Sequence, residues 1–210
     1  MEWTSLSLGP VQANAYIIEN KAKDAVIVDP GAEGERLIAL LESKNLNPAA
    51  ILLTHAHFDH IGGVEKVRNH WSIPVYLHRA EEDWPGDPEK NGSVFFPTGA
   101  ITTQPADEII KEEGRLQVGP FTFQVFETPG HSPGSVSFYS KEEGVVFSGD
   151  VLFAGGIGRT DLYGGNHEQL LESIQDKLLG LPGKTVVAPG HGPETTIDEE
   201  KRTNPFLAGL

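Results

Sequence analysis

The sequence predicts an α/β domain in which helices cover β-sheets. Three observations support this: strand-like segments outnumber helix-like ones, helices interrupt the strands at intervals, and 24 Gly and 15 Pro among 210 residues indicate many tight turns between short elements. The hydrophobic share of 38% and the charged share of 22% are typical of a globular protein. This length suits a single domain, which we expect to span residues 1–210.

The first half of the chain alternates between strand-like and helix-like segments. Short apolar runs bounded by turn residues mark the strands, and leucines at helical spacing mark the first helix. The predicted elements are a hairpin of strands 14–19 and 25–29, a helix 33–43, a buried strand 49–53, a helix 61–70 and a strand 75–77. Residues 85–106 contain four Pro and three Gly, and we expect an irregular surface loop that shapes a pocket.

The second half repeats this alternation. The predicted elements are strands 121–127, 135–139 and 144–147, a helix 168–179 with one apolar face, and a last strand 185–188. Pro-Gly follows a predicted strand three times, at 30–31, 129–130 and 189–190, and twice the next residue is His. Because Pro ends a strand and Gly permits a sharp turn, such strand ends are suited to present functional side chains.

Composition disfavours several classes of function. Sixteen basic against thirty acidic residues give a formal net charge of −14, which disfavours nucleic acid as a partner because polyanions are bound by basic surfaces. The absence of Cys excludes disulfides, thiolate metal ligands and cysteine nucleophiles. No apolar run approaches the roughly 20 residues of a membrane span, and residues 1–6 lack signal-peptide features. We therefore expect no membrane partner and a cytoplasmic location.

The segment from Thr54 to His60 is the strongest functional signal in the chain. Its sequence Thr-His-Ala-His-Phe-Asp-His places three of the eight histidines within six residues, after a buried strand and before a helix. His55 and His57 project to the same side of an extended backbone, whose side chains alternate with a period of two. Asp59 and His60 follow as the chain turns into the helix, so the segment can offer ligand pairs to two adjacent metals. The alternative, a helix start capped by Asp59, needs one polar residue rather than four.

Three further residues complete a candidate metal constellation. His131 and His191 follow Pro-Gly at strand ends, and Asp150 follows an apolar strand and a Gly, where its carboxylate can bridge two metals. Each alone would be an ordinary turn residue, and the cluster at 55–60 is what favours a ligand role. Asp29, at another strand end, is either a turn residue before Pro30 or a hydrogen-bond partner of a ligand imidazole. The histidines assigned as non-ligands are His70, His78 and His167, and Trp3, Trp71 and Trp84 are assigned to packing.

These residues, in this order, resemble the metallo-β-lactamase superfamily. The match consists of the H-x-H-x-D-H segment at 55–60 followed by His131, Asp150 and His191. The resemblance implies an α/β fold of the αββα sandwich type, with two mixed β-sheets packed face to face and helices outside. It also implies two divalent metal ions, one bound by His55, His57 and His131, the other by Asp59, His60 and His191, with Asp150 bridging. Such nitrogen and oxygen ligands suit zinc, iron and manganese, and affinity order favours zinc.

Further motifs are similar to those of the glyoxalase II group and its short bacterial members, described as hydroxyacylglutathione hydrolase-like. The shared segments are 128–135, 147–150, 158–161, 189–193 and 203–207. The resemblance implies that the partner is a small thioester such as S-lactoylglutathione, cleaved by a hydroxide that bridges the two metals. Asp59 and Asp150 are then the catalytic residues, with Asp59 orienting the attacking water or taking its proton.

The same resemblance suggests where the substrate binds. It places Arg159 at a carboxylate of the substrate, and pairing of Arg159 with Asp161 is the alternative. Tyr163 and the 85–106 loop are expected to line the pocket. A thioester suits this centre because a thiol of pKa about 8.5 leaves without strong general-acid help.

Four other functions stay open at this point. A persulfide dioxygenase of the same fold would use a single iron held by His55, His131 and Asp150, although residues 189–193 resemble those of the dinuclear hydrolases. A lactonase or β-lactamase would cleave another ester or an amide with the same centre. The charge of −14 disfavours a nuclease, and a protein that only holds metal is disfavoured because structural metal sites are closed and four-coordinate. The sequence assigns no thiol carrier, acyl group or oligomeric state.

Overall fold

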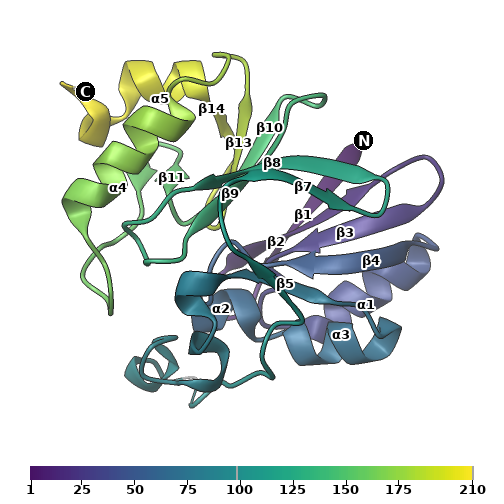
Figure 1. The fold of residues 1–210 in the computed structure, drawn as a ribbon. Helices are drawn as coiled ribbons and strands as arrows, with labels where there is room; N and C mark the ends of the chain where they lie inside the picture. Colours follow the sequence, from purple (N-terminus) through teal and green to yellow (C-terminus); the bar gives the residue numbers. More distant parts are fainter. Residues whose placement is uncertain (98, 210) are drawn as a thin grey trace.

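The computed structural model describes residues 1–97 and 99–209, and these form two six-stranded β-sheets packed face to face (Figure 1). The first sheet has the spatial order β1 (Glu2–Leu8), β2 (Ala13–Glu19), β3 (Asp24–Val28), β4 (Asn47–Leu52), β5 (Val75–His78) and β6 (Glu108–Ile110). β1 to β3 are antiparallel neighbours, and β3 to β6 are parallel. The predicted hairpin is thereby confirmed as β2 and β3, and the predicted buried strand as β4.

The second sheet is built from the later part of the chain. Its spatial order is β14 (Thr195–Thr196), β13 (Val186–Pro189), β10 (Val145–Gly149), β9 (Val136–Ser140), β8 (Phe121–Glu127) and β7 (Gly114–Val118). β10 and β13 run parallel, and the other neighbours are antiparallel. A separate hairpin of β11 (Leu152–Phe153) and β12 (Gly156–Ile157) follows β10. Both sheets are therefore mixed.

Helices cover the outer face of each sheet. α1 (Gly34–Ser43), α2 (Phe58–Ile61) and α3 (Val64–Trp71) lie on the first sheet, whereas α4 (His167–Ser173), a π-helical turn (Ile174–Leu178) and α5 (Ile197–Thr203) lie on the second (Figure 1). Short 3₁₀ turns occur at Arg79–Glu81, Trp84–Gly86, Ser93–Phe95 and Pro205–Leu207. The layers follow the order helix, sheet, sheet, helix. Within the described residues, no helix is long and apolar enough to cross a membrane.

The apolar core lies in three layers between these elements. Side chains of both sheets meet at the centre, where the rings of Tyr16 and Phe147 pack edge to face with centroids 5.2 Å apart. The outer layers are Leu37, Leu41, Val64 and Val67 under the first pair of long helices, and Leu170, Ile174, Leu178 and Ile197 under the second. The packed sheets thus give the strand ends fixed positions, and these ends carry the predicted ligands.

The helix predicted at 61–70 corresponds to α3, and a division of the chain at Gly62 and Gly63 separates it from α2, which begins before the predicted helix. Gly63, between them, packs against the turn after β3: its N–H donates to the Gly31 carbonyl, and a Cβ there would lie 2.9 Å from the Pro30 oxygen. The division leaves α2 as a separate turn that carries Asp59 and His60.

β1, β6, β7 and α5 lack a clear sequence pattern, as do the two-residue strands β11, β12 and β14. β1 and β7 are edge strands of their sheets, and in β1 the small polar residues Ser5 and Ser7 weaken the alternation of apolar side chains. α5 buries only Ile197 and Glu200, which is too little for an apolar period, and its start is fixed by Thr196, whose hydroxyl accepts the Glu199 N–H.

Candidate metal centre

The predicted metal ligands come together at one edge of the sandwich, where strands of both sheets end. β4, β8, β10 and β13 each carry a ligand just beyond their last residue. The ligands are His55 after β4, His131 after β8, Asp150 after β10, His191 after β13, His57 before α2, and Asp59 and His60 within α2. The Pro-Gly turns therefore do what their position in the sequence suggests: they end a strand and expose the next side chain.

Three buried histidines form what we call the first triad. His55, His57 and His131 each offer a ligand atom within 4.8 Å of the others. The Nδ1 of His57 and the Nε2 of His131 are 2.8 Å apart. Nitrogen ligands at bonds of about 2.0–2.1 Å around a tetrahedral ion are separated by about 3.4 Å, so the three rings lie near ligand spacing and this pair would move apart by roughly 0.6 Å around an ion.

Asp59, His60 and His191 form the second triad, whose ligand atoms also lie within 4.8 Å of one another. The Oδ2 of Asp59 is 3.1 Å from the Nε2 of His191 and 3.6 Å from the Nε2 of His60. Gly190 makes this packing possible, because a Cβ there would lie 2.1 Å from the Oδ1 of Asp150. Only glycine lets the turn before His191 approach the centre so closely.

Asp150 connects the two triads. Its Oδ1 lies 3.5 Å from the Nε2 of His60, and its Oδ2 lies 3.6 Å from the Nε2 of His131 and 3.5 Å from that of His191. One carboxylate therefore reaches members of both groups, which is the arrangement that a bridging ligand requires.

Buried polar atoms without a hydrogen-bond partner gather at this centre. Residues 1–97 and 99–209 contain five such side-chain atoms, and four of them are the Nε2 atoms of His55, His57 and His60 and the Oδ1 of Asp150. An unpaired buried polar group costs about 1–3 kcal/mol, and bound cations would satisfy those of His55, His60 and Asp150. The nitrogen and oxygen donors fit divalent ions.

The charges of the centre also fit bound cations. Burial and neighbouring imidazoles hold the pKa of His55 well below its usual value and lower the pKa of His57 to about 3. Both rings are therefore neutral at pH 7 and keep a lone pair for a metal. Burial opposes a charge on His60, yet Asp59 and Asp150 raise its pKa well above the usual value. The carboxylates here thus require positive charge, which divalent ions supply when bound.

Asp29 orients two parts of the centre. Its carboxylate accepts hydrogen bonds from the backbone N–H and the hydroxyl of Thr54, at 2.8 and 2.6 Å, and lies 2.9 Å from the Nδ1 of His60. The Thr54 hydroxyl in turn lies 3.0 Å from the Nδ1 of His55. Asp29 also has a φ of 48°, so it is a turn residue and a partner of a ligand imidazole together.

Glu81 is a buried carboxylate at the centre that no pattern in the sequence predicts. It accepts hydrogen bonds from the backbone N–H of Ala56 at 2.6 Å and of Gly134 at 2.8 Å, and from the Ser132 hydroxyl. Ala56 lies between two histidines of the first triad, and Ser132 follows the third. Burial raises the pKa of Glu81 to about 7, although these hydrogen bonds lower it. Glu81 therefore joins the segments that carry the first triad.

A pocket of about 350 Å³ opens at the centre. Its lining divides into polar residues of the candidate metal centre, which we call the base, and other, largely apolar residues, which we call the walls. The base consists of His57, Asp59, His131, Asp150 and His191, and the walls consist of Val11, Phe58, Asn91, Phe96, Phe153, Ile157, Arg159 and Leu162. Asn91 and Phe96 belong to the 85–106 loop, so this loop shapes the pocket as expected.

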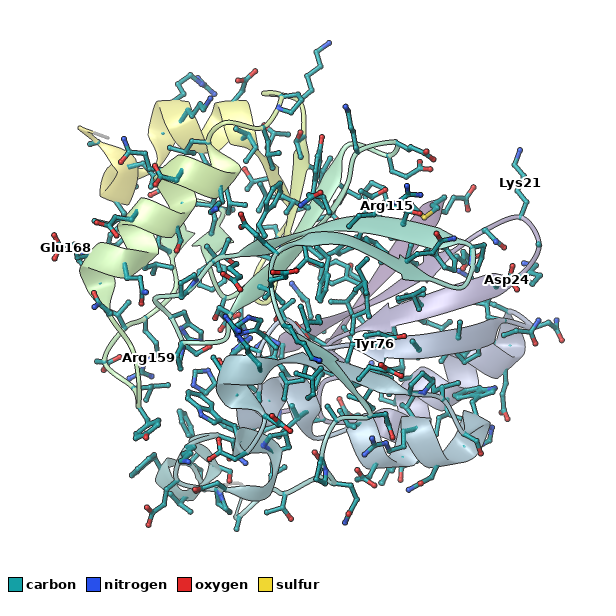
Figure 2. All side chains as sticks on the ribbon, viewed as in Figure 1. Lys21, Asp24, Tyr76, Arg115, Arg159 and Glu168 are labelled. Atoms are coloured by element: carbon teal, nitrogen blue, oxygen red, sulfur yellow. The ribbon has the colours of Figure 1, made fainter. Side chains whose placement is uncertain are left out.

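Arg159 lines the pocket and is also paired with Asp161. Its Nε and Nη2 donate to the two carboxylate oxygens of Asp161 at 2.7 and 2.8 Å, and its carbonyl oxygen accepts from the Nδ1 of His131 at 2.7 Å. Arg159 lies in the connection between β12 and α4, and Figure 2 shows it on the opposite side of the molecule from Lys21 and Asp24. From this position Arg159 can pair with Asp161 and also contact a substrate in the pocket.

Tyr163 lies at the surface, 57% exposed, and is not among the described residues that line the pocket. Its ring packs on Trp84, which is buried and packs on His57, each pair with centroids 5.6 Å apart. A role of Tyr163 toward substrate stays a prediction. The three histidines assigned as non-ligands lie elsewhere: His70 beside Glu42, His78 beside Glu127, and His167 at the start of α4.

The chain is similar to known proteins over most of its length. The sequence profile of the metallo-beta-lactamase superfamily matches residues 8–191. The probable metallo-hydrolase YqgX of Bacillus subtilis is 53% identical over 210 residues, which are 100% of this chain and 99% of that protein. The hydroxyacylglutathione hydrolase GloC of Haemophilus influenzae is 39% identical, over 93% of each protein.

A solved structure gives the same picture at the level of the fold. The crystal structure of the B3 metallo-beta-lactamase BLEG-1 superposes with a TM-score of 0.98 at 56% identity, covering 99% of this chain and 100% of that one. The two-sheet architecture that the sequence motifs implied is thereby confirmed.

Proposed function

We propose that this chain, which belongs to the metallo-beta-lactamase superfamily of metal-dependent hydrolases, cleaves S-acyl thioesters of glutathione or of a similar low-molecular-weight thiol, S-lactoylglutathione among them. The observation that carries the proposal is the link that Asp150 makes between two triads at the base of a pocket. A centre that opens to a pocket suits catalysis, because structural metal sites are closed. The similarity to GloC supports a thioester as the bond that is cleaved.

Each group at the base has a distinct part in this proposal. When bound, two divalent ions supply a water of lowered pKa and positive charge for a developing oxyanion. Asp150 fixes the spacing of the triads. Asp59 lines the pocket, its side chain 12% exposed, and is the base that orients the attacking water or takes its proton. Zinc is the proposed metal, and iron and manganese suit the same donors.

The walls supply little further chemistry, which also suits a thioester. A thiolate leaves without protonation, because the pKa of an ordinary thiol is about 8.5. Arg159 uses two of its N–H groups on Asp161 and keeps others free. These free groups are placed to bind a carboxylate of the thiol carrier, and the proposed partner is this small thioester.

A second candidate function is hydrolysis of β-lactams. The observation that favours it is the similarity to the B3 metallo-beta-lactamase BLEG-1, at 56% identity. An amide in a strained ring carries the same carbonyl chemistry as a thioester, and the base of the pocket would act on it in the same way.

One experiment tests both functions. Protein of measured metal content is assayed against thioesters of glutathione and of other small thiols, and against a set of β-lactams. We expect kcat/KM for the best thioester to exceed that for any β-lactam at least tenfold. Protein that carries two ions and cleaves no thioester would overturn the proposal, and oxygen uptake on glutathione persulfide would indicate the dioxygenase instead.

A further inference from the structure

We infer that the pocket selects thioesters with an apolar acyl group over those with a small hydroxylated one such as lactoyl. This inference rests on the proposed thioesterase function and concerns the side of the substrate that lies away from the thiol. Three observations support it. The walls contain aromatic side chains, the amide of Asn91 is hydrogen-bonded within the protein, and buried contacts hold the β11–β12 hairpin in place.

Three aromatic side chains, Phe58, Phe96 and Phe153, form part of the walls. Phe58 and Phe96 pack together with ring centroids 4.7 Å apart, and both line the pocket. Phe153 packs edge to face on His191 of the second triad, with centroids 6.2 Å apart. A carbonyl held at the base therefore has aromatic surface within reach of its substituents.

The polar groups of the walls are largely occupied. The side-chain amide of Asn91 donates to the carbonyls of Trp84 and Ile101, at 3.3 and 2.9 Å, and its oxygen accepts the Ser93 N–H. Asn91 therefore has its hydrogen bonds within the protein. Arg159 is then the wall residue, among those described, with donors left for a ligand.

This distribution orients the substrate. The thiol carriers under consideration bear carboxylates, and these match the guanidinium of Arg159, whose side chain is 52% exposed at the pocket. With the carrier at Arg159, the largely apolar remainder of the lining is left to receive the acyl group. A hydroxyl on that acyl group would lose its water without gaining a partner there, which lowers kcat/KM by roughly tenfold.

The apolar wall is preformed. Phe153 and Ile157 belong to the β11–β12 hairpin, and the buried Glu200 of α5 accepts the N–H of Gly155 in this hairpin at 2.9 Å. Asn204 donates to the carbonyl of Gly156 at 3.0 Å. Because α5 holds the hairpin from behind, an acyl chain can bury apolar surface without first ordering the wall.

A chain-length series tests the inference with the carrier held constant. S-acetyl-, S-butyryl-, S-hexanoyl- and S-lactoylglutathione are assayed with protein of known metal content. We expect kcat/KM to rise by up to about fourfold for each methylene that the walls bury, and lactoyl to fall below butyryl. The variant Phe153→Ser should flatten this rise, whereas Phe206→Ser, at an exposed Phe outside the pocket lining, should leave it unchanged.

The outcomes separate this inference from the function on which it rests. If kcat/KM does not rise with acyl length, or if it is highest for the lactoyl ester, the inferred selection for apolar acyl groups is wrong and the thioesterase proposal stands. If no ester is cleaved by protein with two ions, the thioesterase proposal fails. Calorimetric binding of linear carboxylates from acetate to octanoate then tests the walls directly: affinity must rise with length, less so in Phe153→Ser, or the inference is wrong.

Discussion

The backbone N–H of Ala56 donates to the carboxylate of Glu81 at 2.6 Å, in the middle of the His-x-His pair of the first triad. The other carboxylate oxygen accepts from Ser132 and Gly134, beside the third histidine of that triad. His57 and His131 are 74 residues apart in the chain, so a single buried carboxylate sets the distance between remote segments. The three histidines of the first triad are therefore held together by a residue that is not itself among the predicted metal ligands.

Replacing Glu81 with Gln tests this positioning role. An amide has one acceptor oxygen. Its NH₂ group would therefore face an N–H or O–H group whose hydrogen bond the carboxylate now accepts. We expect the affinity for one of the two ions to fall about 10- to 100-fold and the other to change little, measured by competition with a chromophoric chelator. Glu200→Gln is the matched control, since Glu200 is equally buried but braces the β11–β12 hairpin. An equal loss of affinity in both variants would refute a specific role of Glu81.

Glu81 also predicts how the stability of metal-free protein depends on pH. Burial raises the pKa of Glu81 to about 7 in the folded state, from an ordinary value of 4.5 in the unfolded state. Between these values the folded protein holds a proton that the unfolded chain has lost, so the free energy of unfolding falls as pH rises. Denaturant titrations of metal-free protein between pH 4 and 8 should show this decline, and Glu81→Gln should reduce it. A decline of equal slope in the variant would assign it to other groups.

Replacing Asp150, the proposed bridge, should lower the metal content of the protein more than replacing one member of a triad. Asp150→Ala and His55→Ala should each lower thioester hydrolysis by at least about 10³-fold, because either change dismantles the site that supplies hydroxide. Elemental analysis should find one metal ion per chain in His55→Ala and less than one in Asp150→Ala, since Asp150 reaches both triads. Two ions and normal turnover in Asp150→Ala would contradict its assignment.

Arg159→Ala separates substrate binding from a purely structural pairing. If Arg159 binds a carboxylate of the thiol carrier, KM should rise about 10- to 100-fold with kcat nearly unchanged, because a contact made equally in ground and transition states adds uniform binding. If Arg159 only braces Asp161, kcat and Tm should fall together. Asp161→Asn is the control that weakens the pairing and keeps the guanidinium. An unchanged KM in Arg159→Ala removes it from the substrate site.

Chelation should destabilise the folded protein. An ion that binds only the native state adds about 4 kcal/mol at a free concentration of 1,000 times its Kd, so treatment with a chelator should lower Tm by several degrees and added zinc should restore it. The difference should shrink as pH falls, because the histidine ligands must be deprotonated to bind metal. Identical melting curves with and without chelator would speak against a metal centre.

Much of the centre follows from the sequence because its ligands stand at strand ends with a local signature. The segment 55–60 and the two Pro-Gly-His turns are visible in one dimension, and the packed sheets bring them together. Asp29 is visible too, since it precedes a Pro-Gly. Which residues group into each triad, in contrast, is implied by the family resemblance, and the structure brings the same residues together.

Glu81 and the apolar walls could not be predicted in the same way. Glu81 is one of two adjacent glutamates, Glu81 and Glu82, at the end of a short 3₁₀ turn, and only the packing of distant segments buries it. Phe153 and Ile157 lie in a hairpin of two-residue strands, too short for any periodicity to show. These are contacts between remote parts of the chain, and they leave no local pattern.

The division of each triad between early and late parts of the chain has a consequence during synthesis. The first triad has two ligands near residue 56 and needs His131, and the second has two near residue 60 and needs His191. A growing chain therefore exposes metal-binding pairs well before it holds a complete triad. The first triad is complete only after β8 has joined its sheet, and the second only after β13 has, so the ions that bind these triads would stabilise finished molecules over partly made ones.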